Sequence, residues 1–193
     1  MKTRIQTFYS YFLIIVFLSH FAPTNLQAQN ESNIDSLETL LHQSQDNERL
    51  EVLSTLGNSY KYINLDTALI FYKEGLRLAQ DRKDKQTEAV ILKNIAQTHF
   101  FKSDYNAALG YLFSALPIFE SLDDTLGQIN SNYAIALIYY IRTQYDLSQP
   151  YTDTALELAK KSNNREREAA ISDLIGDLHF SMDKDYERAL ELL

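Results

Sequence analysis

The stretch LGNSYKYINLDTALIFYKEGLRLA, residues 56–79, places small residues at fixed distances from large ones. Gly57 stands three residues before Tyr60, and Ala68 stands four residues before Tyr72. Residues three or four positions apart lie on the same face of a helix. The stretch is therefore typical of two successive helices that each carry small and large residues on one face.

The first half of this pattern returns along the chain. Four sets share a spacing of three, one and three residues: Leu53, Leu56, Gly57 and Tyr60; Leu92, Ile95, Ala96 and His99; Asn132, Ile135, Ala136 and Tyr139; Ser172, Ile175, Gly176 and His179. The steps from Leu56 to Ile95, Ile135 and Ile175 are 39, 40 and 40 residues. A fixed period of this size indicates a stacked-repeat architecture.

The second half of the pattern returns in step with the first. Its sets are Ala68, Tyr72, Gly75 and Leu76; Ala108, Leu112, Ala115 and Leu116; Ser148, Thr152, Ala155 and Leu156; and a fourth from Ala189 to Leu193. We expect each repeat to be an antiparallel helix pair. Gly57 and Gly176 would admit the partner helix, and Gly75 would admit the next repeat. The predicted fold class is all-α, a right-handed solenoid of helix pairs with a period of about 40 residues.

The residues between the sets fit this division. Asp104 and Asp185 each precede a predicted second helix, where an Asp can cap the N-terminus. Pro150 is expected in the first turn of its helix, where the missing N–H costs little. Pro117 falls inside a predicted helix and is expected to kink it or end it early.

The N-terminus has a different character. Lys2 and Arg4 precede the apolar run YFLIIVFL, and the small residue Ala28 follows. This order is typical of a secretory signal peptide, and the run is shorter than the roughly 20 residues of a membrane span. We therefore expect residues 1–28 to be removed on export, with an uncleaved N-terminal anchor as the alternative.

The remaining chain divides into a cap and a solenoid. Residues 29–49 are predicted to form an N-terminal capping helix, and residues 50–193 a solenoid of about three and a half repeats with the last one incomplete. No such cover is expected at the C-terminal end. Its apolar residues would then be poorly shielded, and self-association through this open end is expected: Ile171, Leu174, Ile175 and Leu178.

Composition narrows the chemistry. The 193 residues have a net charge of −8, which argues against nucleic acid as a partner, and they contain no Cys for disulfides or zinc. His99 and His179 fall where other repeats have Tyr60 and Tyr139, so we interpret them as packing residues. No phosphate loop, HExxH motif or nucleophile elbow occurs. We expect no catalytic residue, no cofactor and no metal.

The combined pattern resembles the tetratricopeptide repeat (TPR) family, whose motif reads W-x2-L-G-x2-Y followed by A-x3-F. Here it appears as Leu53-x2-Leu56-Gly57-x2-Tyr60 with Ala68-x3-Tyr72, and less closely in the later copies. The resemblance covers about residues 50–193, although the period exceeds the usual ~34 residues. It implies a protein or peptide ligand on the concave side, which the first helices line. Exported arrays of this kind resemble the sensory segments of bacterial signal-transduction proteins.

One known TPR ligand site can be tested residue by residue. The carboxylate clamp uses Lys and Asn on the first repeat, Asn on the second, and Lys and Arg on the third. Asn58 and Asn94 match, but Ser54, Asn130 and Ala134 stand where the cations belong. A terminal carboxylate would lack strong charge-assisted partners, so the clamp is excluded.

The side of the first helices that faces away from the packing sets is the candidate ligand groove. Its residues are Asn58, Lys61, Tyr62, Lys93, Gln97, Phe100, Tyr133, Leu137, Tyr140, Asp173, Asp177 and Phe180. Exposed aromatic residues favour partner contact, and the alternative is that these rings pack against neighbouring first helices. The lysines lie toward the first repeats and the aspartates toward the fourth. The expected peptide is therefore acidic at one end and basic at the other.

The resulting hypothesis is an exported, periplasmic or extracytoplasmic scaffold that binds protein or peptide as the sensory segment of a signalling protein. A free-standing periplasmic or secreted adaptor is the first alternative. A second is the N-terminal part of a histidine kinase whose catalytic domain would follow residue 193. Contact with a membrane is expected only through a segment beyond Leu193.

Overall fold

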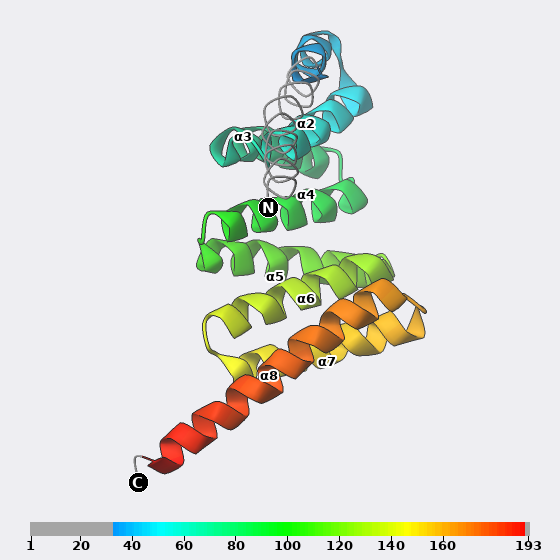
Figure 1. Cartoon of the computed structure of the whole chain (residues 1–193). Coiled ribbons are helices and arrows are strands. Elements are labelled where there is room, and N and C mark those ends of the chain that lie inside the picture. Colours follow the sequence, from blue (N-terminus) through cyan, green and yellow to red (C-terminus); the bar gives the residue numbers. More distant parts are fainter. Residues whose placement is uncertain (1–32, 192–193) are drawn as a thin grey trace, which may run out of the picture.

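The computed structural model describes residues 33–191, without the side chains of residues 46, 47 and 183–191 (Figure 1). The predicted signal peptide lies outside this range. A helix over residues 33–43 comes first, within the segment expected to form the cap. It is followed by α2 (Asp46–Tyr60), α3 (Leu65–Asp81), α4 (Lys85–Phe101), α5 (Tyr105–Ser121), α6 (Thr125–Ile141), α7 (Tyr145–Lys161) and α8 (Arg165–Glu191). No strand occurs among these residues, which confirms the all-α prediction.

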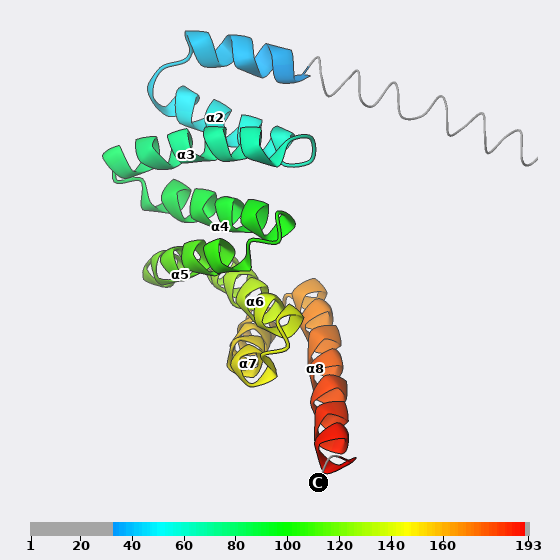
Figure 2. The same cartoon turned by 90° about the vertical axis from the view of Figure 1, so that its left-hand side faces the viewer.

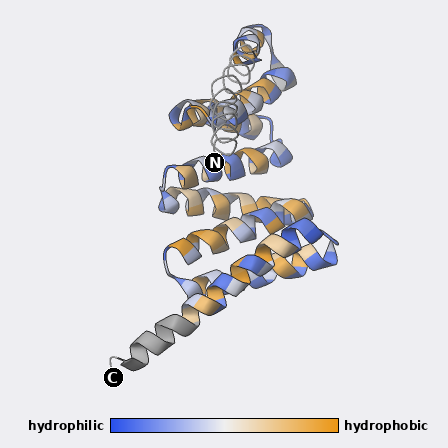
Figure 3. Ribbon diagram, in the orientation of Figure 1, coloured by the Kyte–Doolittle hydropathy of each residue, from blue (hydrophilic) through white to orange (hydrophobic). Residues whose placement is uncertain are grey.

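The helices form a stack in which each one packs against the next along the chain (Figure 1). Additional contacts join α4 to α6 and α6 to α8, the first helices of successive repeats. Seen from the side, the helices from α2 to α7 follow one another down the stack, and α8 runs along one side of its lower end (Figure 2). This succession is that of a helical solenoid. The most apolar helices are α5 and α6, in the middle of the stack (Figure 3).

Equal helices and equal turns produce the 40-residue period. Each of the helices α3 to α7 has 17 residues, and three residues connect each to the next helix. The middle connecting residue has a left-handed backbone, with φ between 52° and 60°, at Lys83, Ser103, Asp123, Thr143 and Asn163. The period is therefore long because both helices of a repeat are long.

Capping side chains fix where these helices begin. Asp84, Asp104 and Asp124 each accept a hydrogen bond from the backbone N–H three residues later, at 2.8–3.1 Å. Asn164 does the same at the start of α8, at 3.1 Å. Such bonds satisfy amides that have no partner within the helix. The capping role predicted for Asp104 is confirmed.

Small residues bring the two helices of a repeat together. A Cβ atom on Gly57 of α2 would lie 2.4 Å from Cε1 of Tyr72 on α3. Between α6 and α7, the buried Ser148 hydroxyl donates to the carbonyl oxygen of Ala136 at 2.7 Å. Both contacts lie where the small residues of the two sets were predicted to meet.

Small residues also bring successive repeats together. A Cβ on Gly75 would lie 3.2 Å from Cδ1 of Ile91 on α4, and Ala115 and Ala155 are fully buried at the equivalent places. A further contact was not foreseen. A Cβ on Gly127 would lie 2.2 Å from Cδ1 of Phe119, so α5 and α6 also meet at a glycine.

The fourth repeat differs from the prediction. The expected turn near Asp185 and the second helix that was to follow it are wrong, because α8 continues unbroken from Arg165 to Glu191 (Figures 1 and 2). The segment SMDKDYERALE contains no Gly or Pro and is rich in good helix formers.

The packing face of α8 is also rotated from the predicted one. Ser172, Gly176 and His179 are exposed, and a Cβ on Gly176 would meet nothing within 4 Å. No second helix covers this side among the described residues. Ile171, Leu174 and Leu178 are instead buried in clusters that include residues of α6 and α7, so the expectation that they are poorly shielded is wrong.

Two expectations for the prolines are wrong: that Pro117 ends its helix early and that Pro150 lies in a first turn. The helix α5 does not end early at Pro117 but continues to Ser121 and matches its neighbours in length. Pro117 is itself exposed and removes only the one hydrogen bond that its own N–H would have donated. Pro150 lies in the second turn of α7 and not the first, because that helix already begins at Tyr145.

Candidate functional site

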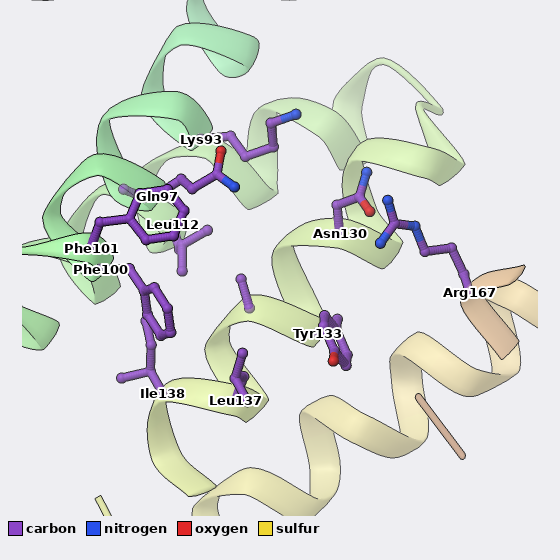
Figure 4. Close-up of a pocket in the computed structure, with 12 residues that line it drawn as sticks. Lys93, Gln97, Phe100, Phe101, Leu112, Asn130, Tyr133, Leu137, Ile138 and Arg167 are labelled. Atoms are coloured by element: carbon purple, nitrogen blue, oxygen red, sulfur yellow. The ribbon is translucent and has the colours of Figure 1, made fainter. Parts of the chain in front are cut away.

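The first helices α4 and α6 enclose a pocket of about 280 Å³ on their shared side (Figure 4). We call it the α4–α6 pocket. It is lined by Lys93, Ala96, Gln97, Phe100 and Phe101 of α4, Leu112 of α5, Asn130, Tyr133, Ala134, Leu137 and Ile138 of α6, and Arg167 of α8. None of these twelve residues is acidic.

Helical spacing explains why these residues share the pocket. Lys93, Ala96, Gln97 and Phe100 follow one another at three, one and three residues, as do Asn130, Tyr133, Ala134 and Leu137 on α6. Each set therefore lies on one face of its helix. Alanine at one position of each set leaves space between the two helices.

The floor of the pocket is apolar. Ala96, Leu112 and Ile138 are buried, and Phe100 and Leu137 are half-buried. The Phe100 ring is fixed by Phe101 and Tyr105, whose ring centroids lie 6.0 and 5.8 Å away. Such a surface can accept an apolar side chain without first having to rearrange.

The rim of the pocket is positively charged. Burial lowers the pKa of the half-buried Lys93 ammonium, and the positive charges of Lys61 and Arg167 lower it further, against an opposing effect of Asp124. Arg167 reaches the pocket from α8 on the side of Asn130 (Figure 4). Across residues 33–191, neither Lys93 nor Arg167 forms a side-chain salt bridge or hydrogen bond.

A polar contact extends the rim toward the first repeat. The Lys61 ammonium at the end of α2 donates to Oε1 of Gln97 at 2.9 Å, and it lies 5.0 Å from the centre of the Tyr62 ring. This contact holds the Gln97 carboxamide at the mouth of the pocket. The rim thus combines three cations with the neutral amides of Gln97 and Asn130.

Known proteins share the helical repeats of this chain. Residues 23–116, just under half of the chain, match the family model of the SusR N-terminal TPR domain. The helix pairs of this chain are therefore TPR-like. This confirms the resemblance found in the sequence. No curated protein matches the chain by sequence.

Two solved structures share the TPR-like fold. Aspartyl phosphate phosphatase F from Bacillus subtilis superposes with a TM-score of 0.73 at 17% identity, over 84% of this chain and 46% of that one. The chain thus spans less than half of the phosphatase. BtubC (BKLC) from P. vanneervenii superposes with a TM-score of 0.62 at 18% identity, over 98% of this chain and 85% of that one. At such identities the likeness concerns the fold alone.

Five of the predicted groove residues line the α4–α6 pocket: Lys93, Gln97, Phe100, Tyr133 and Leu137. Lys61 joins them through its hydrogen bond to Gln97. The structure therefore brings these six predicted residues together at one pocket. Seven lining residues were not predicted to belong to the groove: Ala96, Phe101, Leu112, Asn130, Ala134, Ile138 and Arg167.

The other predicted groove residues lie outside the pocket. Asn58 accepts a hydrogen bond from the Tyr72 hydroxyl at 2.7 Å, and Tyr62 is 77% exposed. Tyr140 packs against a cluster that contains Leu174 and Leu178 of α8, and its ring pairs with Tyr145. Asp173, Asp177 and Phe180 are exposed on α8. The predicted row from Tyr62 to Phe180 is thus not one continuous lining.

The histidines that the sequence assigned to packing have different surroundings. His99 stacks on Tyr111 with ring centroids 5.4 Å apart, and its Nδ1 lies 3.3 Å from a carboxylate oxygen of Asp104. His99 is therefore a packing residue, as predicted. His179 is exposed, so the same prediction is wrong for it.

Among the described residues, no three His, Asp or Glu side chains come together in a way that could hold a metal ion. Within the same range, no helix has both the length and the apolar character needed to cross a membrane.

Proposed function

We propose that this TPR scaffold binds a segment of a partner protein in the α4–α6 pocket and acts by binding, not by catalysis. The observation that carries the proposal is the pocket itself, an apolar floor with a polar rim between the first helices of two repeats. Repeat arrays use such concave surfaces for recognition. A buried apolar centre with polar groups around it is also the usual composition of a protein-binding surface.

We further propose that the protein is exported and serves as the extracytoplasmic sensory segment of a signalling protein. The N-terminal pattern of two basic residues, an apolar run and Ala28 supports export. The match to a TPR domain that is N-terminal in its own family supports a sensory segment placed ahead of other domains. A free-standing periplasmic or secreted adaptor is the second candidate, because these repeats form a stack with its own core.

The test removes the apolar floor while leaving the helices intact. Phe100→Ala combined with Leu137→Ala should abolish pull-down of the partner from cell-envelope extract and leave the helical circular dichroism nearly unchanged. Ile70→Ala is the matched control, because Ile70 is an apolar residue of α3 that is 64% exposed and outside the pocket. Retention of the same partner by a folded double variant would place binding elsewhere.

A further inference from the structure

Resting on the proposed function, we propose that the α4–α6 pocket takes an internal segment of its partner in which a large apolar side chain is flanked by acidic residues on both sides. The proposal follows from the charge of the rim, the size of the floor and the distribution of the cations over three helices.

Among the described residues, the rim cations Lys61, Lys93 and Arg167 lack carboxylate partners. Salt bridges join Lys or Arg to Asp or Glu at other places on the described surface, such as Arg49–Glu74, Arg77–Asp81, Lys85–Glu88, Lys102–Asp66 and Lys161–Glu157. In the described part of the chain, no such pair involves Lys61, Lys93 or Arg167. Three cations without a carboxylate partner among the described residues thus lie at or beside one pocket, although the whole chain has a net charge of −8.

The carboxylate of Asp124, whose negative charge raises the pKa of Lys93, is hydrogen-bonded to other groups. One of its oxygens accepts from the Gly127 amide at 2.8 Å and caps α6, and the other accepts from the Gln86 amide at 3.1 Å. Like charges near each other disfavour the charged form of each group. A ligand that brings carboxylates to the rim would relieve this repulsion, whereas a basic ligand would add to it.

The floor suits one large apolar side chain. A volume of about 280 Å³ lies at the lower limit of ligand pockets, which run from roughly 300 to 1,000 Å³. The floor residues Phe100, Leu112, Leu137 and Ile138 offer contacts to an aromatic or branched aliphatic side chain. The apolar residue of the partner would enter here, and its neighbours in sequence would remain at the rim.

The positions of the cations favour an internal segment over a chain terminus. Lys61, Lys93 and Arg167 come from α2, α4 and α8, so the positive charge is spread over three helices. One terminal carboxylate could neutralise part of this charge only. A segment that continues past the pocket in both directions can place acidic residues near the cations on either side.

The experiment selects ligands without prior assumption. A library of random peptides, displayed with carrier sequence at both ends, is selected on the purified protein. We expect enrichment of Phe, Leu or Trp with Asp or Glu on both sides. A selected peptide should bind about tenfold or more weakly to the variant with Lys93→Gln and Arg167→Gln. It should bind the control with Lys73→Gln and Lys160→Gln within about twofold of wild type, because these two lysines are exposed outside the pocket.

Enrichment of basic or uncharged peptides would overturn the inference that the partner segment is acidic. It would leave the proposed function intact if Phe100→Ala with Leu137→Ala still abolishes binding. A selected peptide made by synthesis should bind equally with an amidated and a free C-terminus, and a requirement for the free carboxylate would contradict an internal segment. If no peptide is enriched, or if the variant with Phe100→Ala and Leu137→Ala binds the selected peptides as well as wild type does, the proposed function fails too. Arg167→Gln alone repeats the charge test should the double variant lose its circular dichroism signal.

Discussion

Gly57 and Tyr72 are in contact so close that a Cβ atom on residue 57 would lie 2.4 Å from the tyrosine ring. The ring has no freedom to move away, because Tyr72 is fully buried and its hydroxyl donates to Oδ1 of Asn58 at 2.7 Å. The first helix pair thus depends on the absence of one side chain.

Gly57→Ala is expected to lower the free energy of unfolding by about 1–3 kcal/mol, the usual cost of overpacking a core. The matched control is Gly176→Ala, where nothing lies within 4 Å of the new atom. There the better helix propensity of Ala should raise stability by up to about 1 kcal/mol. Urea melts of the two variants compare these effects, and equal effects at both positions would contradict the close approach of α2 and α3.

Thr143→Gly is expected to stabilise the protein by about 1 kcal/mol, because a β-branched residue is strained at its φ of 57° and Gly is not. Asn163→Gly serves as the comparison. Asn tolerates the left-handed region better than Thr, so its gain should be smaller. Loss of stability in the Thr143 variant, measured by thermal melts, would show that this turn has a different backbone.

Stability should fall at alkaline pH through Tyr72. Burial raises the pKa of its phenol above the ordinary value of about 10, so the folded state favours the protonated form. This contribution is fully present below pH 10 and is lost as the pH rises above it, because only the unfolded state then ionises readily. Spectrophotometric titration of tyrosinate should show late-titrating phenols in the wild type and fewer of them in Tyr72→Phe. Identical titration curves would contradict the raised pKa.

Export is expected to remove residues 1–28. Mass spectrometry of the protein produced in a host with a secretion pathway should then find Gln29 at the N-terminus. A mature chain that begins at Met1 or Lys2 would favour the uncleaved anchor or a protein that is not exported.

The sequence predicts the solenoid well because the packing signal repeats. Gly57 with Tyr72, and Ser148 with Ala136, are contacts between two residue types that recur at a constant distance. The five left-handed turn residues gave no such signal, since none of them is a glycine. Their conformation follows from the short connection between two packed helices.

The continuity of α8 could not be inferred from spacing. The fourth copy of the pattern predicts a turn, but Gly176 faces no partner among the described residues and the segment beyond it favours helix. A motif therefore indicates a helix pair only where a second apolar face is present to pack against it.

The sequence predicts those pocket residues that share one helix face, but not those that depend on how separate helices pack. Positions of Lys93, Gln97, Phe100 and Leu137 follow from the register of a single helix, which the repeat pattern defines. Arg167 belongs to the first turn of α8, and its place at the pocket depends on how that helix lies across α6. Asn130 and Ala134 stand where the carboxylate clamp would need third-repeat cations. In the structure, the cation at the same pocket is Arg167, which belongs to α8.

The most direct test of the account places a photoreactive amino acid at Gln97, on the rim of the α4–α6 pocket, or at Ile70, on the exposed surface of α3. Irradiation of cell-envelope preparations should crosslink a partner from position 97 and not from position 70. The crosslink should disappear when Phe100→Ala and Leu137→Ala are added. Crosslinking of the same partner from position 70, with none from position 97, would contradict binding in the pocket.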